Sequence, residues 1–400
     1  MATVLCVWEL GSELGHWGKL RVPIVAALRM GHRVFVAARQ LNHATDFLGD
    51  LPVTYLQAPF RQITRVADQS AFLGYAHLLA HQCFSGVDEL AMNVRAWRSI
   101  FDLVHPDIVW FEHSPTALIA SRSYHFRKVV FGAGFFVPPR PASPSAPFAP
   151  FATTARTPEV LEGLHADDRV VLQVVNQALA RLGTDGFAAL ADIYAQADRE
   201  LLMTWPELDH FGARPDARYM GDAPPLARAA PQWPPGPGPK VFGYLQNMPG
   251  LEVLLRDLAT ANVCTLLFVR DLPRKLRDVY SGDQLRFSDK MVDLAGVARQ
   301  AAWVINHANH ATVATFMLEG IPQLVIPRHQ EQLFLALRLV GHGCARMGFQ
   351  DQAGFLKEIT ALCADPSLQQ QATRLQQQCT PRDVLDLEGA MRQTYVELLH

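Results

Sequence analysis

The stretch "INHANHATVATFMLEGIPQLVIPRHQEQ", residues 305–332, decides the fold class. An apolar strand ends in a turn of small polar residues, a helix begins near Ala311, and a second apolar strand follows Gly-Ile-Pro. This order predicts a parallel βαβ unit. Backbone N–H groups at a helix start favour an anion, and small residues let a phosphate approach. From the residues alone, the turn is either a phosphate cradle or an ordinary turn capped by Asn309 or Thr312.

The same alternation begins at the N-terminus, where "TVLCVWEL", "GKLRVPIVAALRMG" and "HRVFVAA" form a predicted β-α-β start. Further strands are predicted at 53–57, 107–112, 128–133 and 200–204. Helices are predicted over about 65–83, 87–104, 115–125, 168–182 and 186–197. Residues 136–150, "FVPPRPASPSAPFAP", are too rich in proline for either element and predict a long loop beside a ligand site.

A proline- and glycine-rich stretch, "APPLARAAPQWPPGPGPK" (223–240), predicts an exposed interdomain linker. A second α/β series follows it, with strands at "VFGYLQN", "VCTLLFV", "LRF", "AWVIN" and "QLVIP". The 400 residues are too many for one core. We therefore expect two doubly wound α/β domains with a ligand held in the cleft between them.

Composition narrows the classes of function. Lysine plus arginine number 36 against 38 acidic residues, which gives no electrostatic footprint for nucleic acid. The start resembles a core strand and not a signal peptide, and no apolar run is long enough for a bilayer. Six dispersed cysteines without a Cys-x-x-Cys pair predict reduced core residues in a cytoplasmic protein. The absence of Asp-x-Asp and of cysteine clusters predicts no metal site.

Residues 307–338 resemble the donor-binding signature of glycosyltransferase family 1, which includes bacterial antibiotic and flavonoid UDP-glycosyltransferases. In that family, His-Gly-Gly-x-Gly-Thr leads a helix, and Gly-Val-Pro, an apolar strand, Pro-x-x-x-Asp-Gln and Asn-Ala-x-Arg follow. The matching residues here are His307, Thr312, Gly320, Ile321, Pro322, Pro327, Glu331, Gln332, Ala336 and Arg338. The chain departs from the pattern at Ala308, Asn309, Ala311, Thr315 and Leu335.

The resemblance implies the GT-B fold, two Rossmann-like domains that face each other across a cleft. Residues 1–222 would bind the acceptor, 223–240 would be the linker and 241–380 would bind the nucleotide sugar. Residues 381–400 would form a helix that crosses back to the N-terminal domain. The segments "ELDHFGARPDARYMGD" and "VFGYLQN" also look like those of bacterial members.

The segment "GSELGHWGK" (11–19) is neither Gly-x-Gly-x-x-Gly nor a P-loop. It resembles the family's Gly-His loop after the first strand, which implies that His16 is the general base. Taken alone, the residue is either a base, a task that suits an imidazole, or a loop histidine bonded to the backbone. Glu112 closes the strand at 107–112 and is the implied orienting acid. His113 should point to the other side of that strand, and it ranks second as a base.

The donor-binding residues implied by the resemblance are Asn247, His307, Ala308, Asn309, Ala311, Thr312, Glu331 and Gln332, with Met291–Leu294 beside the nucleobase. The implied activity is an inverting, metal-independent transfer of the hexosyltransferase type. It needs no cofactor beyond a UDP-, dTDP- or GDP-sugar as co-substrate, and its acceptor is a small or lipid-like molecule. Peripheral membrane contact and the choice between monomer and homodimer stay open. The alternatives are a GT-B sugar-nucleotide epimerase and a non-catalytic helper that binds nucleotide sugars.

Overall fold

The computed structural model describes residues 1–11, 14–60, 72–143, 146–223, 228–379 and 386–399. Its contacts form two compact units. The first unit comprises Met1–Ala223 with Leu385–His400, and the second unit comprises Pro224–Val384.

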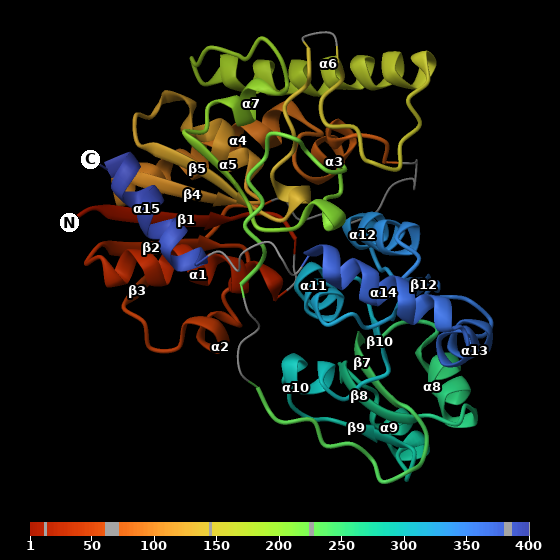
Figure 1. Cartoon of the computed structure of the whole chain (residues 1–400). Coiled ribbons are helices and arrows are strands. Elements are labelled where there is room, and N and C mark those ends of the chain that lie inside the picture. Colours follow the sequence, from red (N-terminus) through yellow and green to blue (C-terminus); the bar gives the residue numbers. More distant parts are fainter. Residues whose placement is uncertain (12–13, 61–71, 144–145, 224–227, 380–385, 400) are drawn as a thin grey trace. The chain divides into compact units, whose positions relative to one another are not determined.

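A six-stranded parallel sheet forms the centre of the first unit (Figure 1). Its order is β3-β2-β1-β4-β5-β6, so the chain reverses direction across the sheet between β1 and β4. The strands are β1 (Thr3–Trp8), β2 (Arg33–Ala38), β3 (Val53–Gln57), β4 (Ile108–Glu112), β5 (Arg127–Gly132) and β6 (Arg199–Leu202). Every residue of β1 and β4 is buried, as expected for central strands covered on both faces.

Helices cover both faces of this sheet (Figure 1). They are α1 (Gly15–Arg29), α2 (Ala44–Leu48), α3 (Tyr75–Gln82), α4 (Val87–Val104), α5 (Pro115–Ala120), α6 (Pro158–Arg181), α7 (Asp192–Ala195) and α15 (Leu387–Leu399). Short 3₁₀ turns follow at Ser121–Ser123, Gly134–Phe136 and Pro206–Leu208.

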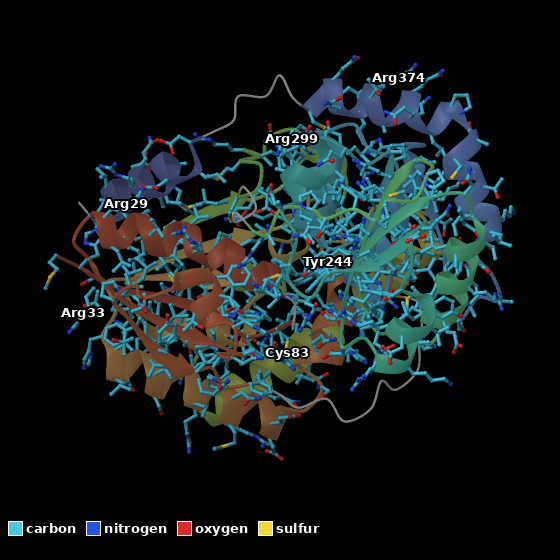
Figure 2. All side chains as sticks on the ribbon, turned by 90° about the horizontal axis from the view of Figure 1, so that it is seen from below. Arg29, Arg33, Cys83, Tyr244, Arg299 and Arg374 are labelled. Carbon is cyan, nitrogen blue, oxygen red and sulfur yellow. The ribbon has the colours of Figure 1, made fainter. Side chains whose placement is uncertain are left out.

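The last helix, α15, belongs to the first unit although it is the end of the chain. It packs along α1 (Figure 1). The Tyr395 hydroxyl donates a hydrogen bond to the carbonyl of Pro23 at 3.0 Å, and its ring lies 5.1 Å from that of Trp110. Figure 2 shows Arg29 on the outside of this unit, where its guanidinium pairs with Glu388 of α15.

The second unit repeats the plan with a parallel sheet of order β12-β11-β10-β7-β8-β9. Its strands are β7 (Lys240–Gln246), β8 (Cys264–Arg270), β9 (Leu285–Phe287), β10 (Trp303–Asn306), β11 (Gln323–Val325) and β12 (Ala345–Met347). The helices are α8 (Leu251–Thr260), α9 (Arg274–Tyr280), α10 (Leu294–Ala298), α11 (His310–Leu318), α12 (Gln330–Gly341), α13 (Leu356–Ala364) and α14 (Pro366–Cys379). Two apolar clusters, one on each face of this sheet, make up its core.

Part of the predicted linker packs onto the second unit. Ala229 forms an isolated parallel bridge with Val292, and the thiol of Cys264 donates to the carbonyl of Pro234 at 3.3 Å. Trp233 packs against the cluster around Phe242. Residues 229–239 are therefore not a wholly exposed connector, because the tryptophan and a buried proline gain apolar contacts there.

Several element boundaries differ from the sequence prediction. Helix α6 starts ten residues early, because Thr157 caps it and Pro158 occupies its first turn. The predicted helix over 186–197 is reduced to α7. The Asn176 amide accepts the Phe187 N–H at 2.8 Å and donates to the Phe187 carbonyl at 2.9 Å, and these bonds replace helical ones. Residues 65–71 of the first predicted helix lie outside the described residues.

The cysteines are free, and five of the six are buried. Cys363 is exposed on α13, which corrects the prediction that all are core residues. Within the described ranges, no helix combines the length and apolar character that a bilayer crossing requires.

Candidate active site

Each sheet has one point where the chain reverses the direction in which it adds strands. Several of the predicted site residues follow the strands on either side of this point. In the first unit this point lies between β1 and β4, and in the second between β7 and β10. Ligands of doubly wound sheets bind outside the carboxyl ends of the strands at such points. His16 follows β1, Glu112 ends β4, and His307 follows β10.

His16 lies in the first turn of α1 and is 4% exposed. Its Nδ1 lies 2.8 and 2.7 Å from the two carboxylate oxygens of Glu112, which is fully buried. The structure thus brings together two residues that are 96 positions apart in the sequence. With a proton on Nδ1, the lone pair of Nε2 is left to accept another.

Aromatic rings hold the imidazole of His16 in place. The Trp8 ring stacks on it at 4.6 Å with 21° between the planes, and Phe136 lies 5.1 Å away. The Trp8 indole N–H in turn donates to the carbonyl of Leu10 at 2.6 Å. Sequence analysis missed Trp8, which ends β1, and Phe136, which lies in the 3₁₀ turn Gly134–Phe136 after β5. The signal that could have found them was this place at the carboxyl ends of two strands of the sheet.

His113 does not point away from His16 as predicted. The strand ends at Glu112, and His113 has a positive φ of 39°, so the alternation of a strand no longer applies. Its ring centroid lies 6.2 Å from that of His16 and 4.4 Å from that of Phe136.

A second buried acid, Glu9, follows β1 directly and was also missed. Its carboxylate accepts the N–H groups of Thr116 at 3.0 Å and Ala117 at 3.3 Å, at the start of α5. Burial raises the pKa of Glu9 from its ordinary value to about 7, although these hydrogen bonds and the charge of Arg39 oppose the change.

The turn after β10 in the second unit is fixed by buried side chains. His307 donates from Nδ1 to the carbonyl of Ile326 at 2.7 Å and accepts the Gln246 N–H on Nε2 at 2.8 Å. Burial lowers the pKa of His307 to about 4, so the ring is neutral at pH 7. Because both ring nitrogens bind the backbone, His307 supports the turn.

Ala308 adopts a left-handed conformation with φ of 62°, where the family pattern has glycine. Its N–H donates to Oδ1 of Asn306 at 2.7 Å, and Nδ2 of Asn306 donates to Gln323 at 2.8 Å. The Ala308 N–H is therefore already hydrogen-bonded. The backbone donors that remain for the predicted phosphate site are those in the first turn of α11. Ala311 is exposed and Thr312 is 3% exposed in that turn.

The amide of Gln332 is engaged at both ends. Its Nε2 donates to Oδ1 of Asn309 at 2.6 Å, and its Oε1 accepts the Arg328 N–H at 2.8 Å. Asn309 is the N-cap of α11 but makes no side-chain capping bond, so its side chain does not occupy the first-turn N–H groups. In this structure Gln332 positions the turn, while Glu331 is half-buried in the first turn of α12.

The remaining predicted residues follow two other strands of the second unit's sheet, the central β7 and the edge strand β9. Asn247 is exposed after β7, and its N–H donates to the carbonyl of Arg270 at 2.9 Å. In the segment Met291–Leu294, Val292 is buried and the Asp293 carboxylate caps α10 through Ala295 and Gly296.

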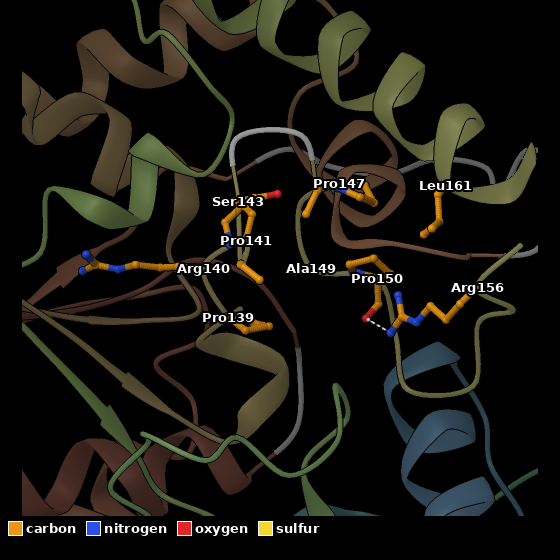
Figure 3. A pocket seen from close by; sticks show the side chains of 11 residues that line it. Pro139, Arg140, Pro141, Ser143, Pro147, Ala149, Pro150, Arg156 and Leu161 are labelled. Atoms are coloured by element: carbon orange, nitrogen blue, oxygen red, sulfur yellow. Dashed lines mark hydrogen bonds between the residues drawn. The ribbon is translucent and has the colours of Figure 1, made fainter. Parts of the chain in front are cut away.

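The proline-rich loop of the first unit borders a cavity of about 400 Å³ (Figure 3). Its lining is mainly proline and alanine, with the side chains of Arg140 and Arg156 at its rim. Arg140 pairs with Glu200 at 2.9 Å, and Arg156 donates to the Pro150 carbonyl at 3.3 Å.

No clustered set of three or more histidine, cysteine, aspartate or glutamate side chains suited to a metal ion occurs within the described part of the chain.

Comparisons with known proteins identify the fold. No family profile matches the sequence, and no curated protein does. Three solved glycosyltransferases are similar over nearly the whole chain. They are SnogD from Streptomyces nogalater (16% identity, 99% of each chain, TM-score 0.63), the calicheamicin glycosyltransferase CalG4 (15%, 100% of this chain and 98% of that one, 0.66) and VinC in complex with dTDP (14%, 99% and 98%, 0.64). The chain therefore has the GT-B fold of these antibiotic glycosyltransferases.

Proposed function

We propose that this protein is an inverting, metal-independent glycosyltransferase that moves a sugar from a nucleoside-diphosphate donor to an acceptor hydroxyl. The observation that carries the proposal is the bond between His16 and Glu112 at the reversal point of a GT-B sheet. An imidazole whose Nδ1 is held by a buried carboxylate is the arrangement of a general base.

In the proposed reaction, the acceptor hydroxyl passes its proton to Nε2 of His16. Its oxygen forms a bond to the anomeric carbon while the bond from that carbon to the diphosphate breaks. The electron pair of the broken bond leaves on the diphosphate oxygen, and attack from the opposite side inverts the configuration. Glu112 stabilises the imidazolium that results.

The second unit would bind the donor. The N–H groups of Ala311 and Thr312 and the dipole of α11 would hold the diphosphate, with Glu331 on sugar hydroxyls. VinC and SsfS6 were solved with dTDP and thymidine diphosphate, which supports a nucleoside diphosphate as ligand here. The cavity beside the proline-rich loop favours an apolar acceptor.

The test is release of nucleoside diphosphate from UDP-, dTDP- and GDP-glucose, with 2-naphthol or water as acceptor. His16→Ala should lower release about 100- to 10,000-fold without changing donor affinity, and Glu112→Gln should cost less because the imidazole survives. His125→Ala, an exposed histidine of the same unit, is the control and should be silent. If His16→Ala released nucleoside diphosphate at a near-normal rate, another residue would be the base. His113 would then be the next residue to test.

The same assay separates the alternatives. An epimerase would convert the nucleotide sugar into its epimer, with no transfer of the sugar to an acceptor and no net release of nucleoside diphosphate. A helper protein would bind the donor and release nothing.

A further inference from the structure

The reactive edge of His16 faces the backbone of Gly11. A Cβ atom built on Gly11 would lie 2.3 Å from Nε2 and 2.9 Å from Cε1 of that ring. Carbon atoms in contact are normally about 3.5–4.0 Å apart, so any side chain at this position would overlap the imidazole. Only glycine leaves room beside Nε2.

The imidazole cannot easily move aside from such a side chain. Glu112 holds Nδ1 through both carboxylate oxygens, and Trp8 covers one face at 4.6 Å. Trp8 is itself fixed by its bond to Leu10 and is 1% exposed. An added Cβ would therefore either fill the space at Nε2 or break the contacts that orient the ring.

Gly11 is exposed, in contrast to the ring that it faces. Nε2 makes no hydrogen bond to any residue that the structure describes, so it is the one ring nitrogen of His16 left for a ligand. A side chain at position 11 would lie directly against this nitrogen.

We propose that Gly11 controls acceptor access. The acceptor hydroxyl reaches Nε2 of His16 through the space that a side chain at position 11 would fill. This inference rests on the proposed function, because it assumes that Nε2 receives the hydroxyl proton. Under this inference, Gly11 contributes to the reaction because it has no side chain.

A positive φ is a competing reason for glycine at this position, because φ is +86° at Gly11. Gly31 provides the matched control. Its φ is +77°, but a Cβ there would meet nothing within 4 Å. Substitution of Gly31 thus introduces the backbone strain without the steric overlap.

The experiment compares Gly11→Ala with Gly31→Ala, and Gly11→Asn with Gly31→Asn. Asparagine tolerates a positive φ better than alanine and still carries the Cβ atom, so it keeps the test informative if alanine prevents folding. Three quantities are measured on the full chain: diphosphate release from dTDP-glucose with 2-naphthol or water, dTDP affinity by calorimetry, and the thermal midpoint of unfolding.

We expect both Gly11 variants to release diphosphate about 100-fold more slowly than their Gly31 counterparts, with equal dTDP affinity. The overlap with the imidazole should also lower the thermal midpoint of the Gly11 variants below that of the Gly31 variants. Equal release rates in the Gly11 and Gly31 variants would overturn the inference. Loss of dTDP binding, or a midpoint at or below the assay temperature, would also overturn it, because the loss of activity would then be structural.

The result for His16→Ala separates this inference from the proposed function. If His16→Ala is inactive and the Gly11 variants are active, only the access role of Gly11 fails. If His16→Ala is active, the assignment of the base fails and the inference falls with it.

Discussion

At the scale of single residues, the two histidines after central strands have opposite roles. Among the described residues, His16 forms hydrogen bonds only through Nδ1, which leaves Nε2 for a ligand. Both ring nitrogens of His307 form hydrogen bonds with the backbone of its own unit. Sequence alone cannot separate the two, since each follows an apolar strand and precedes a helix. The difference lies in the partners that the fold brings to each ring.

The pKa of His307 predicts a pH dependence of stability. Burial lowers this pKa from an ordinary value of 6.5 to about 4. Between these two pH values, His307 is protonated in the unfolded chain and neutral in the folded chain. Stability of the second unit should therefore fall as the pH drops from about 6.5 to 4. The contribution of this group is at most about 3 kcal/mol, at 1.36 kcal/mol per pKa unit.

Urea unfolding of the wild type and of His307→Gln at several pH values measures this effect. The difference between their free energies of unfolding should shrink as the pH falls below 6.5, because glutamine does not titrate. It should stay constant between pH 7 and 8. A difference independent of pH down to 4 would show that His307 titrates normally.

At the scale of elements, α11 supplies the proposed phosphate site. Thr312→Asp would place a negative charge in its first turn. The charge repels a diphosphate, so dTDP affinity should fall markedly. Because Thr312 is buried, the charge should also lower stability, and the thermal midpoint shows whether the variant is still folded in the binding assay. Calorimetry measures the affinity.

Two variants control for this substitution. Thr315→Asp lies one turn further along the same helix and should weaken binding less, while Thr312→Val removes only the hydroxyl. Unchanged affinity in Thr312→Asp would remove the phosphate site from this turn.

Helix α15 shows how the end of the chain completes the first unit. Tyr395 is fully buried against Trp110 and bonds to Pro23. Tyr395→Phe should cost about 1 kcal/mol of unfolding free energy, the net value of one hydrogen bond. Tyr395→Ala should cost about 3–5 kcal/mol through the cavity it leaves. Chemical denaturation measures both values, and equal costs would show that the ring contributes no packing.

At the scale of the whole molecule, the two units differ in how many segments of the chain form them. The second unit is one continuous segment with its own apolar core, whereas the first needs α15 from beyond it. The fragment 224–384 should therefore fold alone, with a cooperative unfolding transition, and should bind dTDP. A fragment 1–223, which lacks α15, should be much less stable. Failure of fragment 224–384 to unfold cooperatively would contradict its independence.

The sequence by itself determined the αβ alternation, the parallel sheets and the residues at the strand ends. These depend on local periodicity and on turn chemistry, which are written in neighbouring residues. The resemblance to glycosyltransferase family 1 indicated His16 and Glu112, and the shared edge of parallel strands explained how the two side chains could meet. The glycosyltransferase-like fold was implied by the same resemblance, in residues 307–338.

Only the tertiary structure decided what each of these residues contacts. It turned His113 toward His16, engaged His307, Ala308 and Gln332 within the protein, and set Gly11 against Nε2. It also settled that residues near 233 pack on the second unit. These outcomes depend on close packing and on hydrogen bonds between residues far apart in the sequence, and local patterns carry no record of such contacts.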